Sequence, residues 1–352
     1  MQTTIAELQE AVRRAAATKT ALRIRGAGSK DFYGEALRGE LLDMSGYRGI
    51  VDYEPTELVI TVRAGTPIAE VEAAMAERHQ MLAFEPPRFG GRGTIGGAVA
   101  TGLSGPRRQQ AGAVRDFVLG VRIIDGKGDD LSFGGKVIKN VAGFDVSRLM
   151  VGSMGMLGVI TEVTLKTQPR PPAEASLRIA TTVEAALRLM NEWAGKPLPV
   201  SATCYCNGTL SVRLSGAEAA VRAAQEKLGG DAVADAESGW DGLRDHTAEF
   251  FQGSDPLWRM SLPSTAPLAP VGQRQLVEWG GALRWIAGQL DGAQLRDQVG
   301  ALGGHVTLFR AAQKSVPVFH PLAPAVASIH RRLKAALDPQ SIFNPGRMYT
   351  DL

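Results

Sequence analysis

The chain has 352 residues, enough for about two domains, and its 44% hydrophobic and 21% charged content is that of an ordinary globular protein. Its net charge of +3 is small and evenly spread, which excludes a strongly basic nucleic-acid-binding protein. The first residues lack the apolar core of a secretory signal, and no run of 18 apolar residues predicts a membrane span. Cys204 and Cys206 are too few for a zinc site or an iron–sulfur cluster. We expect reduced thiols on one face of a strand, in a cytoplasmic protein.

The first half of the chain predicts short strands interrupted by two glycine-rich loops. A capping box at Thr4–Glu7 predicts a helix to about residue 17, and a strand at 21–25 runs into the first loop, residues 26–30. Thr66-Pro67 predicts the start of a helix to about residue 78, so this part looks like a small β-α-β unit. Other expected elements are strands at 41–43, 49–53, 58–64, 116–125, 130–133 and 159–167 and a short helix at 145–150.

The second glycine-rich stretch, Gly90 to Gly105, contains seven glycines in sixteen residues. Glycine costs backbone entropy, so this concentration predicts that a ligand or a second backbone lies against the chain. Thr94 could cap a helix that begins at Ile95, with free N–H groups facing outward to bind phosphate. The alternatives are a surface loop or a tightly packed glycine and alanine helix. The pattern G-x-G-x-x-G also occurs here, but prolines precede it where a Rossmann fold needs a strand.

The second half predicts an α+β domain after a proline-rich linker at 168–172. A capping box at Thr181–Glu184 predicts a helix that ends near Gly195, and Asn207-Gly208 predicts a hairpin between strands 201–206 and 209–214. Further elements are expected as helices at 217–228, 292–302 and 324–337 and as strands near 258–262, 282–287 and 305–310. This order favours an antiparallel sheet with helices on one face.

Several segments together resemble the vanillyl-alcohol-oxidase (PCMH-type) flavoenzymes. The segments that carry the resemblance to the FAD-binding domain of that family are Arg25–Lys30, Gly93–Gly105, Lys139–Asp145 and Val151–Glu162, with Ile342–Met348 resembling its closing motif. Within the family, Arg25–Gly34, Leu257–Pro263 and Gly303–Arg310 are similar to the glycolate oxidase (glycolate dehydrogenase) branch. The order and spacing of the segments are more specific than any single glycine motif.

The resemblance implies an α+β fold. Residues 1–170 would form a PCMH-type FAD-binding domain, with a small β-α-β subdomain and a mixed-sheet subdomain. Residues 171–323 would form an antiparallel α+β cap domain, and residues 324–352 would return to the flavin site.

The resemblance also implies an FAD site. Backbone amides of residues 26–30 and 94–97 would hold the pyrophosphate, and small residues would line the adenosine and isoalloxazine slots. The residues expected to bind FAD are Arg25, Gly26, Ala27, Gly28, Ser29, Lys30, Gly93, Thr94, Ile95, Gly96, Gly97, Thr101, Gly102, Gly105, Gly143, Gly155, Val159 and Ile160. In this family a His after the first glycine cluster, or a later Cys, can attach the flavin covalently. Ser29-Lys30 occupies the first place and no Cys precedes Cys204, so we expect non-covalent FAD.

The implied activity is oxidation of a small 2-hydroxy acid, glycolate, to glyoxylate. Hydride would leave the α-carbon for FAD, and electrons would pass on within a complex that contains a companion flavoprotein subunit and an iron–sulfur subunit. Any membrane association would be peripheral, at the inner face of the cell membrane, and through that complex.

Whether this chain itself oxidises the substrate stays open. Related D-2-hydroxy-acid dehydrogenases carry a His-rich, Asp-Gly-Asn-containing stretch that binds metal and substrate, whereas this chain has only His305 in a comparable place, and we expect no metal. Arg259, Arg310 and Arg347 could face a substrate carboxylate, because guanidinium groups bind carboxylates bidentately. The resemblance favours Asn344 and Arg347, because the family's closing motif returns to the flavin domain, and the candidate catalytic residues are Asn344, Arg347 and Arg310. One hypothesis is a competent FAD-dependent dehydrogenase subunit. The other is a flavin-carrying assembly or electron-relay subunit.

Overall fold

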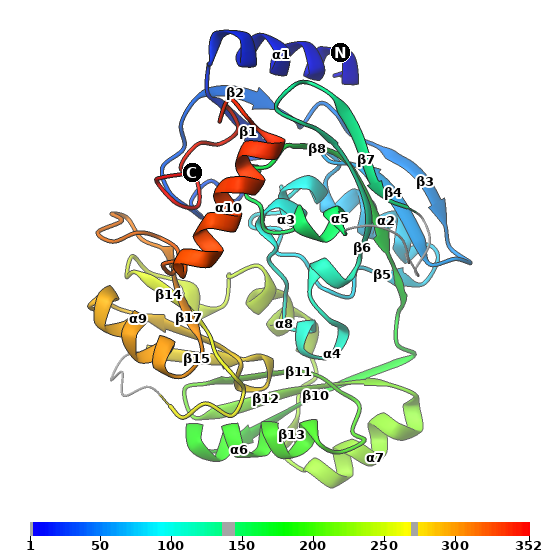
Figure 1. The fold of residues 1–352 in the computed structure, drawn as a ribbon. Coiled ribbons are helices and arrows are strands. Elements are labelled where there is room, and N and C mark those ends of the chain that lie inside the picture. Colours follow the sequence, from blue (N-terminus) through cyan, green and yellow to red (C-terminus); the bar gives the residue numbers. More distant parts are fainter. Residues whose placement is uncertain (1–2, 136–144, 269–273) are drawn as a thin grey trace. The chain divides into compact units, whose positions relative to one another are not determined.

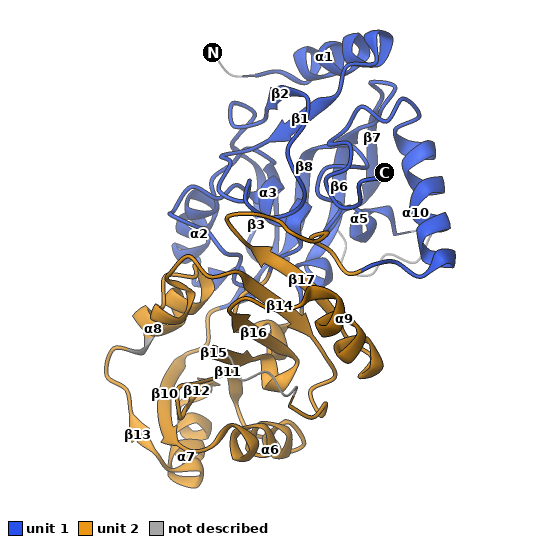
Figure 2. Ribbon diagram, turned by 90° about the vertical axis from the view of Figure 1, so that its left-hand side faces the viewer, with its two compact units in different colours: residues 1–103, 113–169, 321–352 blue, residues 104–112, 170–320 orange. Residues whose placement is uncertain are grey.

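The computed structural model describes residues 3–135, 145–268 and 274–352, and the chain forms two compact units (Figures 1 and 2). Unit 1 contains residues 1–103, 113–169 and 321–352, and unit 2 contains residues 104–112 and 170–320. The expected borders at 170/171 and 323/324 differ from these by one and three residues. Residues 104–112, which we expected in the FAD-binding domain, group with unit 2 instead.

The N-terminal part of unit 1 is a helix packed on a pair of strands. Helix α1 (Ile5–Thr18) begins with the predicted capping box, in which Thr4 accepts from the Glu7 amide and the Glu7 carboxylate accepts from the Thr4 amide at 2.8 Å. Its apolar side chains Leu8 and Val12 are buried against β1 (Leu22–Arg25) and β2 (Glu40–Asp43), which pair in parallel. The loop that joins β1 to β2 contains the first glycine cluster.

The C-terminal tail completes this subdomain. After α10 (Pro324–Leu337), the chain runs beside β1, where the Leu22 amide donates to the Ile342 carbonyl at 2.7 Å and the Asn344 amide donates to the Leu22 carbonyl at 2.9 Å. Ile342 and Phe343 are fully buried in the core that α1 and β1 share. Residues 321–352 are therefore part of unit 1 and contribute to its core.

A five-stranded antiparallel sheet forms the rest of unit 1, in the order β3-β4-β8-β6-β7. Its strands are β3 (Ile50–Glu54), β4 (Val59–Arg63), β8 (Val159–Lys166), β6 (Val118–Ile124) and β7 (Asp130–Gly134). The remaining elements of unit 1 are α2 (Ile68–Ala76), β5 (Gln80–Met81) paired with β9 (Gln168–Pro169), α3 (Ile95–Thr101), the 3-10 turn Val114–Asp116 and α5 (Val146–Leu149). Helix α3 packs against β4 and β8, beside the sheet.

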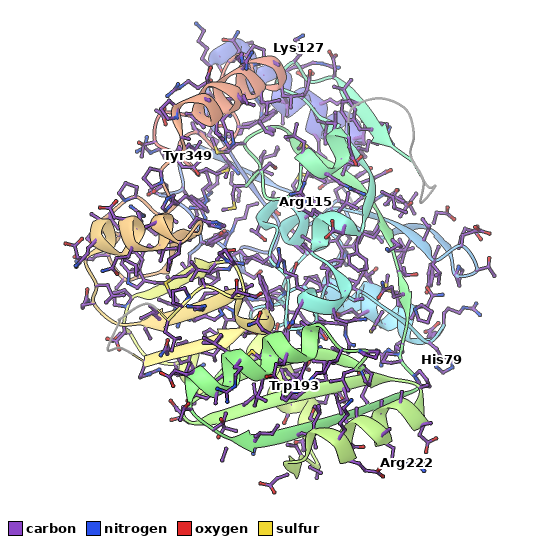
Figure 3. The ribbon with its side chains drawn as sticks, turned by 60° about the horizontal axis from the view of Figure 1, so that its bottom comes forward. His79, Arg115, Lys127, Trp193, Arg222 and Tyr349 are labelled. Carbon is purple, nitrogen blue, oxygen red and sulfur yellow. The ribbon has the colours of Figure 1, made fainter. Side chains whose placement is uncertain are left out.

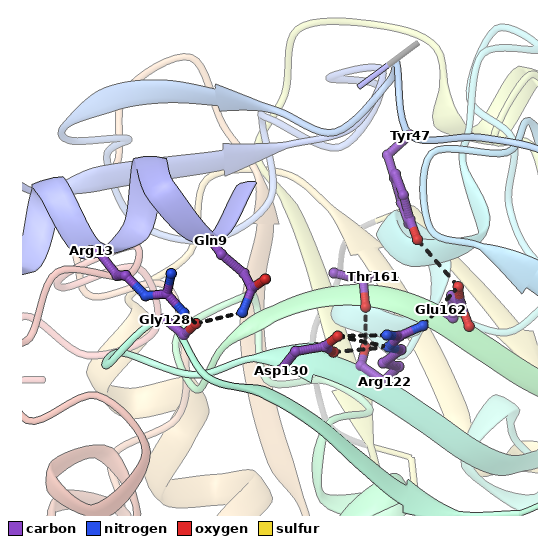
Figure 4. A network of polar contacts seen from close by, with 8 residues as sticks. All are labelled: Gln9, Arg13, Tyr47, Arg122, Gly128, Asp130, Thr161 and Glu162. Carbon is purple, nitrogen blue, oxygen red and sulfur yellow. Dashed lines mark hydrogen bonds and ion pairs between the residues drawn. The ribbon is translucent and has the colours of Figure 1, made fainter. Parts of the chain in front are cut away.

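Polar contacts fix the sheet to its surroundings (Figure 4). The guanidinium of Arg122 on β6 donates to both carboxylate oxygens of Asp130 on β7 and lies 3.5 Å from the carboxylate of Glu162 on β8. Gln9 and Arg13 of α1 both donate to the carbonyl of Gly128, which has a φ of +81° in the β6–β7 turn. These contacts join three strands and attach α1 to the end of the sheet.

Unit 2 is built on an eight-stranded antiparallel sheet of order β13-β10-β12-β11-β15-β16-β14-β17. The strands are β10 (Ala173–Ala180), β11 (Val200–Cys206), β12 (Thr209–Gly216), β13 (Asp231–Ala232), β14 (Leu257–Ser261), β15 (Arg274–Glu278), β16 (Leu283–Ala287) and β17 (His305–Arg310). The helices are α4 (Arg108–Ala111), α6 (Val183–Ala194), α7 (Glu218–Leu228), α8 (Ala236–Arg244) and α9 (Gly292–Ala301), with 3-10 turns at Glu249–Phe251 and Trp279–Gly281.

The two faces of this sheet differ in character. Helices α6, α7 and α9 cover an apolar face, where Trp193 is buried on α6, while Arg222 lies on the exposed side of α7 (Figure 3). The opposite face carries both polar and aromatic side chains: Trp240 of α8 donates to Ser176 of β10 at 2.9 Å, and Trp285 of β16 and Phe309 of β17 pack against His246. The predicted α+β class, with a PCMH-type domain and an antiparallel second domain, is confirmed.

Several local expectations were wrong in detail. The helix expected from Thr66-Pro67 is present as α2, but it follows β4 of the five-stranded sheet. The small subdomain is therefore α1 with the parallel pair β1 and β2 and not a β-α-β unit, and the larger sheet is antiparallel and not mixed. Thr66 does not cap α2, because its hydroxyl contacts the Gly49 backbone and donates to the Arg63 carbonyl. Thr182, one residue after the predicted position, caps α6. Strands β10 and β15 and helices α4 and α8 were not predicted.

Candidate functional site

The first glycine loop borders two adjoining cavities in unit 1. The loop, residues 26–30, leaves the end of β1, and α3 and the backbone around Met154 lie across from it. Ile24, Gly26, Thr94 and Gly97 line both cavities, so the two form one elongated depression between loop and helix. We call this depression the loop cavity. It is the place where both predicted glycine clusters meet.

Four consecutive amides belong to the part of the loop that lines this cavity. Within the described part of the chain, the N–H groups of Gly26, Ala27, Gly28 and Ser29 donate to no acceptor. Gly28 has a φ of +73°, a conformation that glycine adopts without strain. A run of backbone amides that turns its N–H groups to one side binds anions. The loop therefore fits the pyrophosphate of a dinucleotide such as FAD.

The N-terminus of α3 does not contribute as expected. Thr94 caps the helix, as predicted, and its hydroxyl accepts from the Gly97 amide at 3.2 Å. The Ile95 amide donates to the Thr66 carbonyl and the Gly96 amide to the Ala64 carbonyl. These three amides are engaged inside the protein, which corrects the expectation that residues 94–97 present free N–H groups. Helix α3 instead supplies a close, small-residue wall.

Glycines are required where this wall meets its neighbours. A Cβ at Gly26 would clash with the Thr94 hydroxyl, and a Cβ at Gly96 would lie 2.6 Å from that of Ala64. A Cβ at Gly155, which has a φ of +71°, would lie 2.7 Å from the side-chain nitrogen of Asn344. Side chains at these positions would clash with those neighbours and displace the loop, α3 or the tail, and the loop cavity would lose its shape.

The predicted FAD-binding residues fall into three groups. Those that line the loop cavity are Arg25, Gly26, Ala27, Gly28, Ser29, Lys30, Thr94, Gly96, Gly97, Thr101, Gly155 and Ile160. Those that do not line it are Gly93, Ile95, Gly102, Gly105 and Val159. Gly143 lies outside the described residues. Ile95 and Val159 are fully buried in the core, and the Gly105 carbonyl accepts from Trp279 within unit 2.

Sequence reasoning missed other residues that line the cavity. These are Ile24, Asp31, Leu37, Met44, Ala64, Ala100, Met154 and Gly158. Asp31 pairs with Arg25 at 2.8 Å and so orients a cation at the loop. Asp31 follows the loop directly and could have been noticed, whereas the apolar residues reach the cavity only through tertiary packing.

Asn344 and Arg347, two of the expected catalytic residues, serve as backbone clamps. The Asn344 side chain accepts from the Ile24 amide at 2.8 Å and donates to the Met154 carbonyl at 2.7 Å. Arg347 is 5% exposed and donates to the carbonyls of Asp31, Tyr33 and Glu35, which follow the glycine loop. Both residues line the cavity, but these donors are already engaged. The contacts favour a positioning role over binding of a substrate carboxylate.

Arg310, the third candidate, lies in unit 2 beside a buried aromatic cluster. It donates to the Phe251 carbonyl, and burial lowers its pKa. The ring of His246 stacks on Phe251 at 4.1 Å between centroids and meets Trp285 edge-on at 4.9 Å. Burial, and then Arg310 and Arg259, lower the pKa of His246 to about 3, so this imidazole is neutral near pH 7.

The two cysteines of the chain lie together in unit 2. Cys204 and Cys206 are free and line one cavity of about 390 Å³ in unit 2, and burial raises the pKa of both thiols. Across the described ranges, no three His, Cys, Asp or Glu side chains come together as metal ligands. No helix in those ranges is both long and apolar enough to cross a membrane.

The fold and the loop cavity define a class, the FAD-binding oxidoreductases with a PCMH-type domain. Residues 2–134 match the family model described as FAD binding domain. Solved structures of alkyldihydroxyacetonephosphate synthase share the fold, with a TM-score of 0.69 at 16% identity over 97% of this chain and 74% of that one.

The sequence comparison narrows the class. The chain is 49% identical to glycolate oxidase subunit GlcE of Escherichia coli K12, over 98% of this chain and 97% of that protein. It is 35% identical to D-2-hydroxyglutarate dehydrogenase of Xanthomonas citri pv. viticola, and 31% identical to glycolate oxidase subunit GlcD of Bacillus subtilis. These two matches cover 49% and 46% of this chain and 37% and 35% of those proteins. The chain belongs to the family of glycolate oxidase subunit GlcE, whose cofactor is FAD.

Proposed function

We propose that this chain is the FAD-carrying subunit of an oxidoreductase complex that oxidises glycolate, or a closely similar small 2-hydroxy acid, to the 2-oxo acid. The observation that carries the proposal is the run of four unengaged amides, Gly26 to Ser29, over the loop cavity. The near-full-length similarity to a glycolate oxidase subunit supports the choice of substrate. FAD, when bound, supplies the acceptor for the hydride, with its electron pair, that leaves the α-carbon of the hydroxy acid, while the hydroxyl loses its proton.

The chain's own groups would hold the cofactor without a covalent bond. Amides of residues 26–29 would bind the pyrophosphate, the cations of Arg25 and Lys30 would balance its charge, and α3 would pack against the ribityl and adenosine parts. Ser29 and Lys30 are not residues that attach a flavin, and both cysteines belong to the sheet of unit 2. We expect acid precipitation of the holoprotein to leave FAD in the supernatant. Yellow protein in the pellet would contradict this expectation.

A second candidate function is flavin carriage or electron relay, with oxidation performed by a companion subunit. The specific observation in its favour concerns Asn344 and Arg347. Their side-chain N–H groups donate to backbone carbonyls, of Met154 and Asp31 respectively, and so hold the loop in place. Under this alternative the proposed companion flavoprotein subunit oxidises glycolate, and an iron–sulfur subunit receives the electrons in either case.

One experiment separates the two candidates. The chain is purified alone, its flavin content is measured by absorbance, and glycolate is added without oxygen. Bleaching of the flavin band supports oxidation by this chain. A flavin that stays oxidised alone and bleaches only when the companion subunits are added supports the relay function. A folded chain that takes up no FAD would reject both.

A further inference from the structure

Helix α10 exposes apolar side chains along one face. The residue of α10 that is buried in the structure is Lys334, although the helix has 14 residues. Val326 is 41% exposed and Ile329 is 46% exposed, and the other exposed large apolar side chains of the described chain, Leu41, Ile50 and Val51, lie on strands β2 and β3. Leu333 follows at the spacing that places it on the same face. The apolar side of α10 is therefore not covered by the rest of the described chain.

A groove of about 600 Å³ runs along this face. His330 and Leu333 of α10 line it, together with Leu149, Leu157 and Met348. The lining leucines and Met348 are half-buried. Figure 3 labels Arg115, which also lines the groove, and Tyr349, whose ring packs against His330 in the tail that follows α10. We call Val326, Ile329 and the groove together the α10 surface.

The uncompensated charge around the α10 surface is positive. Asp145 is paired with Arg148 at 3.1 Å, and Asp351 is paired with Arg331 at 3.0 Å. Arg115 in the groove and Arg332 on α10 make no ion pair with any described residue, and α10 contains no acidic residue. An apolar centre with charged residues at the rim is the usual arrangement of a protein–protein interface.

We propose that the α10 surface binds a companion subunit of the proposed complex, through an apolar ridge flanked by carboxylates. The inference rests on the proposed function, because it requires that a companion exists. A second copy of this chain would bring a second set of uncompensated arginines to the same rim, which like-charge repulsion opposes. A flat lipid surface would contact Val326 and Ile329 but would leave the groove behind them unfilled.

The test uses the complete complex. The chain is co-expressed with the companion flavoprotein and iron–sulfur subunits encoded by its own organism, with an affinity tag on the companion flavoprotein. Ile329→Asp places a charge at the centre of the surface, and Leu41→Asp is the matched control, since Leu41 is 48% exposed on β2. We expect recovery of the chain with the tagged subunit to fall at least tenfold for Ile329→Asp and to stay unchanged for Leu41→Asp.

Two further measurements keep the test independent of folding. Both variants should retain FAD and the wild-type melting temperature, because the substituted side chains are exposed. Arg332→Glu should also lower recovery, and the loss should be greater at low salt than at high salt. Arg222→Glu, on the exposed side of α7, is the matched charge control and should have no effect.

The outcomes distinguish this inference from the proposed function. A wild-type chain that is never recovered with the companion subunits rejects the complex and this surface together. Equal recovery of wild type and Ile329→Asp rejects the surface and leaves the complex standing. A wild-type dimer that Ile329→Asp converts to a monomer, or binding to anionic vesicles that this variant loses, would show a different occupant and overturn the inference.

Discussion

At the scale of single residues, Gly26 lies where β1, the loop of residues 26–30 and α3 meet. Its lack of a side chain lets the Thr94 hydroxyl approach the loop, and the same hydroxyl holds the Gly97 amide. The glycine loop and α3 therefore meet at the contact between Gly26 and Thr94, where there is no room for a Cβ atom. The requirement for glycine here comes from packing, since the φ of Gly26 is not in the left-handed region.

We predict that Gly26→Val lowers FAD affinity by at least about tenfold, because the added side chain displaces Thr94 and distorts the amide loop. Fluorescence titration of the apoprotein with FAD measures the change. Gly135→Ala is the control, since a Cβ there meets no atom within 4 Å. Wild-type FAD affinity in Gly26→Val would show that this loop does not bind the pyrophosphate.

His246 predicts an acid-dependent loss of stability in unit 2. Its pKa is about 3 in the folded chain and near its ordinary value of 6.5 in the unfolded chain. Between these values the unfolded state binds more protons, so stability falls as the pH falls from 6.5 toward 3. The loss between pH 6.5 and 4.5 should be up to roughly 2.5 kcal/mol.

His246→Phe keeps an aromatic ring against Phe251 and removes the titrating group. Urea unfolding followed by tryptophan fluorescence at pH 7.5 and 4.5 should show a smaller loss of stability in this variant than in the wild type. The same loss in both proteins would mean that other groups cause the acid sensitivity.

At the scale of elements, a buried ion pair fixes the end of α10. The Lys334 ammonium donates to the Asp338 carboxylate at 2.7 Å and to the carbonyls of Met156 and Phe343 at 2.8 Å. Asp338 is fully buried and accepts from the amides of Ile342 and Phe343. Every donor of the ammonium is used, and the pair sets the direction in which the tail leaves the helix.

We predict that Lys334→Met destabilises unit 1 by about 3–5 kcal/mol, since it leaves a buried carboxylate without its cation. The double variant Lys334→Met with Asp338→Asn should cost less, because no charge remains unpaired. Thermal unfolding of both proteins measures the difference. If the single variant is no less stable than the double variant, the pair does not contribute in this way.

The sequence predicted those elements whose signals are local. The capping box at Thr4, the hairpin at Asn207-Gly208 and the Thr94 cap all rest on contacts between residues a few positions apart, and each is present. Strands β10 and β15 were missed, because their assignment depends on pairing with β12 and β16 across the sheet.

The candidate site was predictable to a similar degree. The amide loop could be predicted from its glycines, since a turn of that kind has few uses. The hydrogen bonds of the Ile95 and Gly96 amides could not be predicted, because their acceptors, the carbonyls of Thr66 and Ala64, reach them only through tertiary packing. The same holds for Asn344, whose partners lie 320 and 190 positions away in the chain.

At the scale of the whole molecule, unit 1 is assembled from three separate stretches of chain, with unit 2 formed by the residues between them. The tail supplies Phe343 to the core and Asn344 to the wall of the loop cavity. Neither β1 nor the amide loop is complete without it.

We predict that a chain ending at residue 320 loses FAD binding and that a separate peptide of residues 321–352 restores it in part. Flavin fluorescence and absorbance measure binding, and a peptide with Asn344→Ala is the control that should restore less. Full FAD binding by the shortened chain would show that the tail is dispensable for the site.

The pairing of Leu22 with Phe343 also sets an order of events during synthesis. While the ribosome is still making the tail, β1 has been outside it for some 300 residues and lacks the neighbour that completes its edge. Unit 2 can fold during translation, since all its residues emerge earlier. The loop cavity cannot be completed before residues 321–352 emerge, so we expect a product that terminates before them to hold no FAD.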